Sequence, residues 1–100
     1  MLNHSGDESV AASVARGPET LRSAYDAARL AFEIGRSVRE LRERRGWSQT
    51  QLANASGMTQ SAVARFEAGG TVPTLMVLER LAMALDVSLK VGFEPRGEAA

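Results

Sequence analysis

WSQTQLANASGMTQSAVARFEAGG occupies residues 47–70 and contains two short helical patterns separated by a glycine. Ser48 and Gln51 have the spacing of a capping box, in which the serine hydroxyl accepts from the Gln51 backbone N–H and the glutamine side chain bonds back. A helix is therefore expected to begin at Gln49. It is expected to end at Gly57, because glycine adopts a left-handed backbone conformation at little cost.

A second short helix is expected directly after this glycine. Thr59 is a typical helix cap, and the helix it starts spans about 60–68, before two glycines. Ala53 falls where the two helices cross, and a larger side chain there would push them apart. Val63 and Phe66 fall on the inner face of the second helix. The predicted geometry is a helix-turn-helix with the 60–68 helix carried on the outside of the domain.

The flanking sequence predicts two more helices and a strand. Residues 19–45 show apolar positions at three- and four-residue steps, and glycine follows them. Thr74 caps a further helix that continues to about residue 86. Residues 87–93 alternate apolar with polar or small side chains, which is typical of a strand with one buried face. A lone strand needs a partner for its backbone groups, most simply its own copy in a second subunit.

The chain therefore divides into three parts. Residues 1–18 are rich in Ser, Ala and Gly and are expected to form a disordered tail. Residues 19–86 are expected to form the helical domain, and residues 87–100 a C-terminal strand and tail. The expected fold is all-α, a compact helix-turn-helix bundle with a long N-terminal helix and a short C-terminal β-strand that pairs across a homodimer.

Composition excludes several classes of function. The 100 residues, 44% of them hydrophobic, suit one small domain, for which dimerisation would add stability. There is no cysteine, and the only histidine is His4, so no zinc site or catalytic triad can be assembled. No enzyme activity, metal or cofactor is expected. The chain shows neither a transmembrane run nor a signal-peptide core, so a cytoplasmic protein without a membrane partner is expected.

Charge is balanced overall but not along the chain. Residues 36–72 carry six arginines against three glutamates, whereas residues 1–35 carry three basic and five acidic groups. A basic excess around the helix-turn-helix is a weak electrostatic indication of nucleic-acid binding. A solvated face of mixed charge is the alternative explanation.

The motif resembles the phage-repressor or XRE type of helix-turn-helix protein, with a lambda-repressor-like domain, over residues 34–86. The resemblance rests on Ser48-Gln49-x-x-Leu52-Ala53, Gly57, Thr59-Gln60-x-x-Val63 and Phe66-Glu67-x-Gly69 at fixed spacings. One position departs from the family, since Ser56 stands where an aliphatic residue is usual, and looser packing under the turn is expected.

The resemblance implies a role in binding double-stranded operator DNA for particular residues. Those expected to face the major groove are Thr59, Gln60, Ser61, Ala64 and Arg65. Glutamine can pair with adenine and arginine with guanine through two hydrogen bonds. Phosphate contacts are implied for Gln49 and for the backbone of Gly69 to Thr71 with the Thr71 hydroxyl. Arg42 and Glu67 match an ion pair that ties the 19–45 helix to the 60–68 helix. For the polar helix residues, a merely solvated surface is the alternative.

Together with the motif, the TLMVLERLAMAL pattern of residues 74–85, the strand-like VSLKVGF of residues 87–93 and the long N-terminal helix resemble antitoxins of the HigA and HipB type. The resemblance implies an antitoxin that binds a partner toxin, neutralises it and represses the shared operon. Two alternatives remain: a stand-alone XRE-type transcriptional repressor, and an adaptor that uses the helix-turn-helix only to bind protein.

Overall fold

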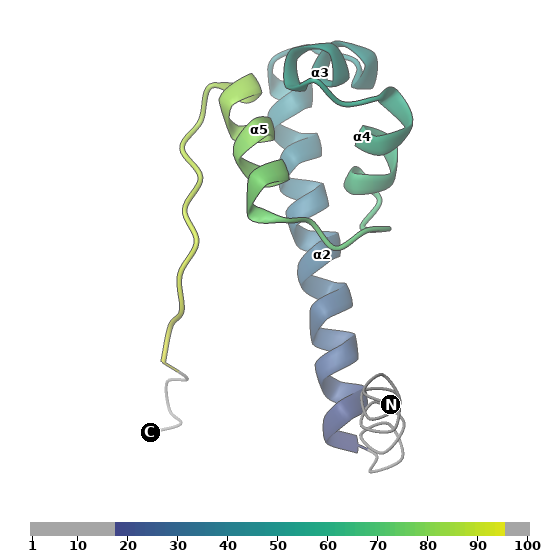
Figure 1. Ribbon diagram of the computed structural model, residues 1–100, viewed down its shortest axis with the longest axis vertical. Helices are drawn as coiled ribbons and strands as arrows, with labels where there is room; N and C mark the ends of the chain where they lie inside the picture. The colour runs from purple at the N-terminus through teal and green to yellow at the C-terminus, as the bar shows by residue number, and fades with distance from the viewer. Residues whose placement is uncertain (1–17, 96–100) are drawn as a thin grey trace, which may run out of the picture.

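Hydroxyl side chains and glycines set most of the helix ends in the computed structural model, which describes residues 18–95, with side chains from residue 23 (Figure 1). The helices are α2 (Pro18–Arg44), α3 (Gln49–Ser56), α4 (Gln60–Glu67) and α5 (Leu75–Leu85). The tail expected over residues 1–18 lies outside the described residues apart from Pro18, where α2 begins.

The break between α3 and α4 has the expected cause. The Ser48 hydroxyl accepts from the Gln51 N–H at 3.1 Å, and the Gln51 side chain accepts from the Ser48 N–H at 2.7 Å. Gly57 then ends α3 with a φ of 74°, a left-handed conformation that few other residues tolerate. Thr59 caps α4 by accepting from the Ala62 N–H at 3.0 Å. The turn is therefore fixed by local hydrogen bonds at both sides of the glycine.

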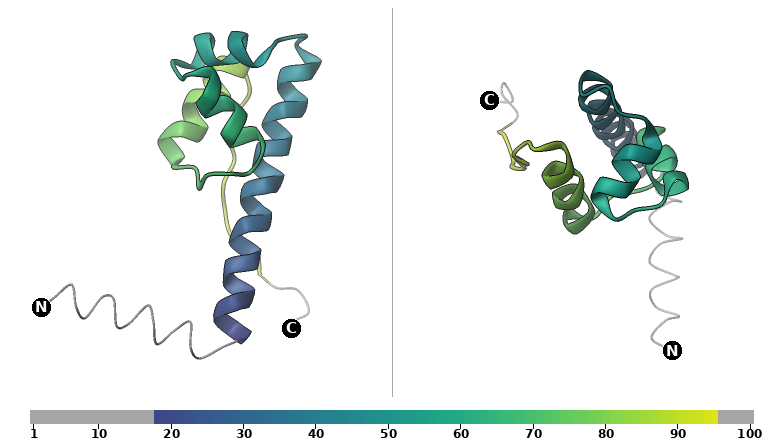
Figure 2. Two further views of the ribbon diagram at one scale, coloured as in Figure 1. Left: turned by 90° about the vertical axis from the view of Figure 1, so that its right-hand side faces the viewer. Right: turned by 90° about the horizontal axis from the view of Figure 1, so that it is seen from above.

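The core lies where α2, α3, α4 and α5 meet. Leu52 of α3, Val63 of α4 and Leu81 of α5 are its fully buried side chains, and Phe66 and Leu85 pack beside them. Burying a side chain of this size contributes about 1.5–3 kcal/mol. The expected inner face of α4 is thus confirmed, and its opposite face is left pointing outward (Figure 2).

Ser56 does not leave the packing loose. It is buried, and its hydroxyl donates to the carbonyl oxygen of Leu52 at 2.8 Å. The carbonyl oxygen of Ala53 lies 3.3 Å from the same hydroxyl. A buried hydroxyl costs little when it is hydrogen-bonded. The serine therefore replaces an aliphatic contact with a bond to the last turn of its own helix.

Gly35 lets α2 and α4 touch through their backbones. A Cβ atom on Gly35 would overlap the carbonyl oxygen of Phe66 and lie 2.8 Å from that of Glu67. No side chain fits there without moving α4 away from α2. This glycine therefore fixes the distance between the long helix and the C-terminal end of α4.

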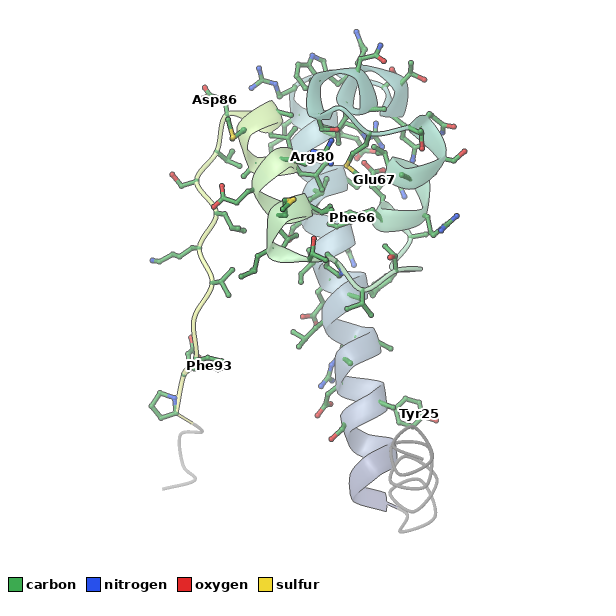
Figure 3. All side chains as sticks on the ribbon, viewed as in Figure 1. Tyr25, Phe66, Glu67, Arg80, Asp86 and Phe93 are labelled. Atoms are coloured by element: carbon green, nitrogen blue, oxygen red, sulfur yellow. The ribbon has the colours of Figure 1, made fainter. Side chains whose placement is uncertain are left out.

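The N-terminal half of α2 extends away from the other helices as an arm, defined here as residues 18–33 (Figure 1). The core contacts of α2 begin near Ala31, and the large apolar side chains described from residue 23 onward on the arm, Tyr25, Leu30 and Phe32, are exposed. Tyr25 is 74% exposed and points away from the bundle (Figure 3). The apolar periodicity of the sequence thus continues beyond the core that the described residues form.

The expected C-terminal strand is not formed in the single chain. Residues 87–95 run as an extended segment that leaves α5 and runs toward the same end of the molecule as the arm, without strand hydrogen bonds among the described residues (Figures 1 and 2). Leu89 is half-buried near α2 and α5, whereas Phe93 is fully exposed. One chain offers this segment no neighbouring strand, so alternation alone does not produce a ladder.

No helix within residues 18–95 combines the length and the apolar character needed to cross a membrane.

Candidate nucleic-acid interface

Helix α4 has one buried and one exposed face, and the residues predicted to contact DNA lie on the exposed one. Val63, Phe66 and Glu67 point inward. Thr59, Gln60, Ser61 and Arg65 are exposed, and Ala64 between them is half-buried. The structure therefore brings the five predicted groove residues together on one outward surface, called here the α4 face.

The buried face of α4 is tied to α2 by the Arg42–Glu67 ion pair. Nε of Arg42 lies 2.7 Å from Oε2 of Glu67, and Nη2 lies 2.8 Å from Oε1. The third nitrogen of the guanidinium donates to the Trp47 carbonyl oxygen at 2.8 Å. Two parallel bonds of this kind fix orientation as well as distance, so the pair holds α4 in one rotation relative to α2.

Both groups of the pair have shifted pKa values. The hydrogen bond to Glu67 raises the pKa of Arg42, against the effect of burial. Burial by itself raises the pKa of Glu67, but hydrogen bonds from Arg42 and Gln49, with the positive charges of Arg42 and Arg39, outweigh it and lower that pKa. Glu67 is therefore ionised near neutral pH and keeps its bonds to α2 and α3.

Gln49 lies between this ion pair and the α4 face. Its Nε2 donates to Oε1 of Glu67 at 3.1 Å, and its Oε1 accepts from Nε2 of Gln60 at 2.7 Å. Because a carboxylate can only accept, the charge of Glu67 fixes which way the Gln49 amide points. That orientation in turn commits one N–H of Gln60 and leaves its Oε1 and its second N–H available.

This arrangement changes the emphasis of the Gln49 prediction. Its side chain is engaged within the protein, so the phosphate contact predicted for it falls chiefly to the backbone N–H at the start of α3, where the helix dipole favours an anion. The link from Glu67 through Gln49 to Gln60 was missed in the sequence. The residues are 11 and 18 positions apart, and only the turn at Gly57 brings them together.

The loop after α4 is partly committed to ending that helix. The Gly69 N–H donates to the Phe66 carbonyl at 3.0 Å, and the Gly70 N–H donates to the Arg65 carbonyl at 2.9 Å. Gly69 has a φ of 77°. Since the Gly69 and Gly70 donors are both occupied, the predicted phosphate contact of this loop narrows to Thr71, which is exposed.

Arg45 and Trp47, which precede α3, both have contacts within the protein. Trp47 packs against the core. The guanidinium of Arg45 lies 4.5 Å from the centre of the Trp47 ring and donates to the Leu85 carbonyl at the end of α5 at 3.2 Å. Arg45 thus joins the end of α2 to the end of α5.

Comparison with known proteins agrees with this geometry. The profile of the helix-turn-helix family matches residues 38–91, more than half of the chain. The competence pilus inhibition repressor of Acinetobacter baylyi is 42% identical over 58 residues, which are 58% of this chain and 53% of that protein. The HTH-type transcriptional regulator SutR of Escherichia coli is 30% identical over 66 residues, 66% of this chain and 37% of that protein. The chain thus matches about half or less of the length of these two relatives.

A solved structure is also similar. The restriction-modification controller protein C.AhdI from Aeromonas hydrophila superposes with a TM-score of 0.61 and 36% identity, covering 63% of this chain and 91% of that one. The capped α3, the glycine turn, the outward α4 and these matches lead to one conclusion. The chain belongs to the helix-turn-helix family and carries a domain of the XRE type.

Proposed function

We propose that this chain is a sequence-specific DNA-binding transcriptional regulator that inserts α4 into the major groove. The observation that carries the proposal is the α4 face: polar and basic side chains are exposed on a helix whose other face is held by a buried ion pair and the core. The similar proteins named repressor, regulator and controller support the same function.

The proposal assigns a contact to each end of α4. Gln60 is suited to adenine, because an acceptor and a donor of its amide remain free, and Arg65 is suited to guanine. The α3 N-terminus and Thr71 lie beside the α4 face and supply phosphate contacts, which fix the position of the helix without selecting a sequence.

Selection from a random duplex library, followed by titration, tests the proposal. The wild type should enrich one sequence, and Arg65→Ala should lose discrimination at one base pair by about 1–3 kcal/mol while the fold survives. Arg29→Ala is the matched control, because Arg29 lies on the arm and pairs with Asp26. A wild type that enriches no sequence would contradict the proposal.

Salt dependence separates DNA binding from an adaptor role. Each phosphate that the protein neutralises contributes about −0.9 to the slope of log affinity against log salt. A DNA-binding protein should show a clearly negative slope, and an affinity independent of salt would favour the adaptor.

An antitoxin is the second candidate, and the arm is the observation that favours it. Tyr25, Leu30 and Phe32 are exposed apolar side chains on a helix that extends beyond the DNA-recognising unit, and such surfaces are typical of protein contacts. Co-expression with the product of the adjacent gene tests this role. Tyr25→Ser with Phe32→Ser should abolish partner binding and toxin neutralisation, with DNA affinity retained. No co-purifying toxin would exclude this candidate and leave the stand-alone regulator.

The regulator is further proposed to act as a homodimer through residues 87–95. Recognition helices of a dimer lie about 34 Å apart to meet successive major grooves. An extended segment with apolar side chains on alternate positions is suited to pair with its own copy, and Val91 and Phe93 are exposed on it. The test of this pairing depends on the whole assembly and is given in the Discussion.

A further inference from the structure

The side chain of Arg65 leaves α4 across the next loop, where it meets a glycine. A Cβ atom built on Gly70 would lie 3.0 Å from Cγ of Arg65, 3.4 Å from its carbonyl oxygen and 3.9 Å from its Cδ. The same glycine donates its N–H to the Arg65 carbonyl at 2.9 Å. The aliphatic part of the arginine therefore lies directly against a position that has no side chain.

The backbone does not explain why glycine stands there. The left-handed conformation that ends α4 is taken by Gly69, with a φ of 77°, and Gly70 is not among the residues of positive φ. Position 70 therefore does not require glycine for a left-handed backbone. What the missing side chain provides is space, and the group that occupies this space is the stem of Arg65.

The end of Arg65 is free to bind a ligand. Its guanidinium forms no ion pair or side-chain hydrogen bond with the side chains described from residue 23 to residue 95. By contrast, Arg42 and Arg45 donate to groups of the protein. A long side chain that is held at its stem and free at its tip loses less conformational freedom when the tip binds.

We propose that Gly70 is a positioning residue for DNA recognition: it seats the stem of Arg65 and so directs the guanidinium toward a guanine in the major groove. This inference rests on the proposed DNA-binding function and deepens it, because it assigns part of the sequence preference to a residue outside α4. Alanine at position 70 moves a flexible side chain rather than the backbone, so the fold is retained while the direction of Arg65 changes.

A double-mutant cycle on the full chain tests this role. The affinities of wild type, Gly70→Ala, Arg65→Ala and the double variant are measured for the selected duplex and for one with the Arg65-dependent base pair exchanged. Gly70→Ala should lower discrimination at that base pair about fivefold or more, a fraction of what one good bidentate contact provides. In the Arg65→Ala background the same change should have no effect. Ser37→Ala is the control, since Ser37 is exposed on α2 and lies outside the α4 face and the proposed dimer segment.

Three outcomes overturn the inference. Base-pair discrimination that is unchanged in Gly70→Ala shows that the contact between Gly70 and the Arg65 stem does not affect DNA recognition. An equal loss with and without Arg65 shows that Gly70 instead allows close approach of the DNA backbone. A thermal midpoint that falls in Gly70→Ala but not in Ser37→Ala shows that Gly70 has a structural role instead.

A measurement without DNA separates this inference from the proposed function. In the free protein, nuclear Overhauser contacts between the Arg65 γ-protons and the Gly70 α-protons are expected. Their absence shows that the Arg65 stem does not pack against Gly70, even if the protein binds DNA specifically. Their presence in a protein that enriches no duplex sequence shows that the packing exists but that its role in DNA recognition is wrong.

Discussion

Glu67 is the single residue on which most of the candidate interface depends. It accepts two bonds from Arg42 and one from Gln49, and Gln49 in turn accepts from Gln60. One buried carboxylate therefore connects the scaffold of α2 with the α4 face. Removing its charge should affect stability and DNA affinity together.

Glu67→Gln should destabilise the fold by about 3 kcal/mol or more, because it leaves the buried guanidinium of Arg42 without a counter-charge. Chemical denaturation measures this loss. Glu43→Gln is the matched control: its exposed pair with Arg39 contributes about 0.2–1 kcal/mol. Equal effects of the two substitutions would show that burial of the Arg42 pair has no energetic importance.

Acid should produce the same weakening in the wild type. The pKa of Glu67 in the folded state lies below its ordinary value of 4.5, so its stabilisation is complete above that pH and is lost as the pH falls through the folded-state pKa. The unfolding free energy should therefore decline below about pH 4.5. Glu67→Gln should show a shallower decline, and identical pH profiles would be inconsistent with this account.

Asp86 is a residue whose replacement should stabilise the protein. It ends α5 with a φ of 58°, and its side chain is negative at the negative end of the helix dipole. Asp86→Asn keeps a side chain that tolerates this conformation and removes the charge, so a gain of about 0.3–1 kcal/mol is expected. Asp86→Ala should destabilise, since alanine has no local hydrogen bond to offset the left-handed backbone. Thermal unfolding of both variants measures the difference, and a lower midpoint for the asparagine variant would refute it.

At the scale of elements, the decisive contact is the backbone approach of α2 to α4 at Gly35. Gly35→Ala gains helix propensity of about 0.5–1 kcal/mol but places a methyl group against the carbonyl oxygens of Phe66 and Glu67. Overpacking of this kind costs about 1–3 kcal/mol, so net destabilisation with weaker DNA binding is expected. Ser37→Ala, on the exposed side of the same helix, is the control. A rise in thermal midpoint for Gly35→Ala would show that α4 moves away from α2 at little energetic cost.

The elements also show how far the sequence predicts the fold. The caps at Ser48, Thr59 and Thr74 and the turn at Gly57 are local chemistry, and they were predicted from the sequence correctly. The end of the core along α2 was not predictable, because a periodic pattern continues whether or not another helix covers it. The role of Gly35 was not predictable either, because its close contact depends on where α4 lies in three dimensions.

The strand predicted over residues 87–93 is absent from the single chain for a related reason. Alternation specifies two faces but supplies no neighbouring backbone, and the single chain offers none. For the interface, the exposed residues of α4 were predictable from the motif. The Glu67–Gln49–Gln60 link and the seat at Gly70 were not, since they join side chains from different elements.

At the scale of the whole molecule, the proposed dimer can be tested through charge. If two copies of residues 87–95 pair antiparallel about Gly92, Lys90 of each copy faces Glu94 of the other, and Val91 faces Phe93. Opposite charges across a strand pair are favourable by about 0.2–1 kcal/mol, and like charges are unfavourable. A register centred on Lys90 would instead place two lysines face to face.

Lys90→Glu should therefore weaken the dimer, and Lys90→Glu combined with Glu94→Lys should restore it. Sedimentation across a range of concentrations measures the dissociation constant of each variant. Asp86→Asn serves as a control, because residue 86 precedes the segment. A dimer that is insensitive to both changes would place the contact elsewhere, and a monomer at all concentrations would remove the pairing altogether.

Lys90 is also the only lysine among the 100 residues, and it lies exposed on the segment that follows α5. Apart from an α-amino group, amine-directed chemistry therefore has one target in this chain, far along the sequence from the α4 face. A fluorophore attached there reports the surroundings of the C-terminal segment while the arginines next to the DNA candidate surface stay unmodified. Because nearly all basic residues of this chain are arginines, an amine-reactive label attaches selectively to the segment where a second copy is proposed to bind.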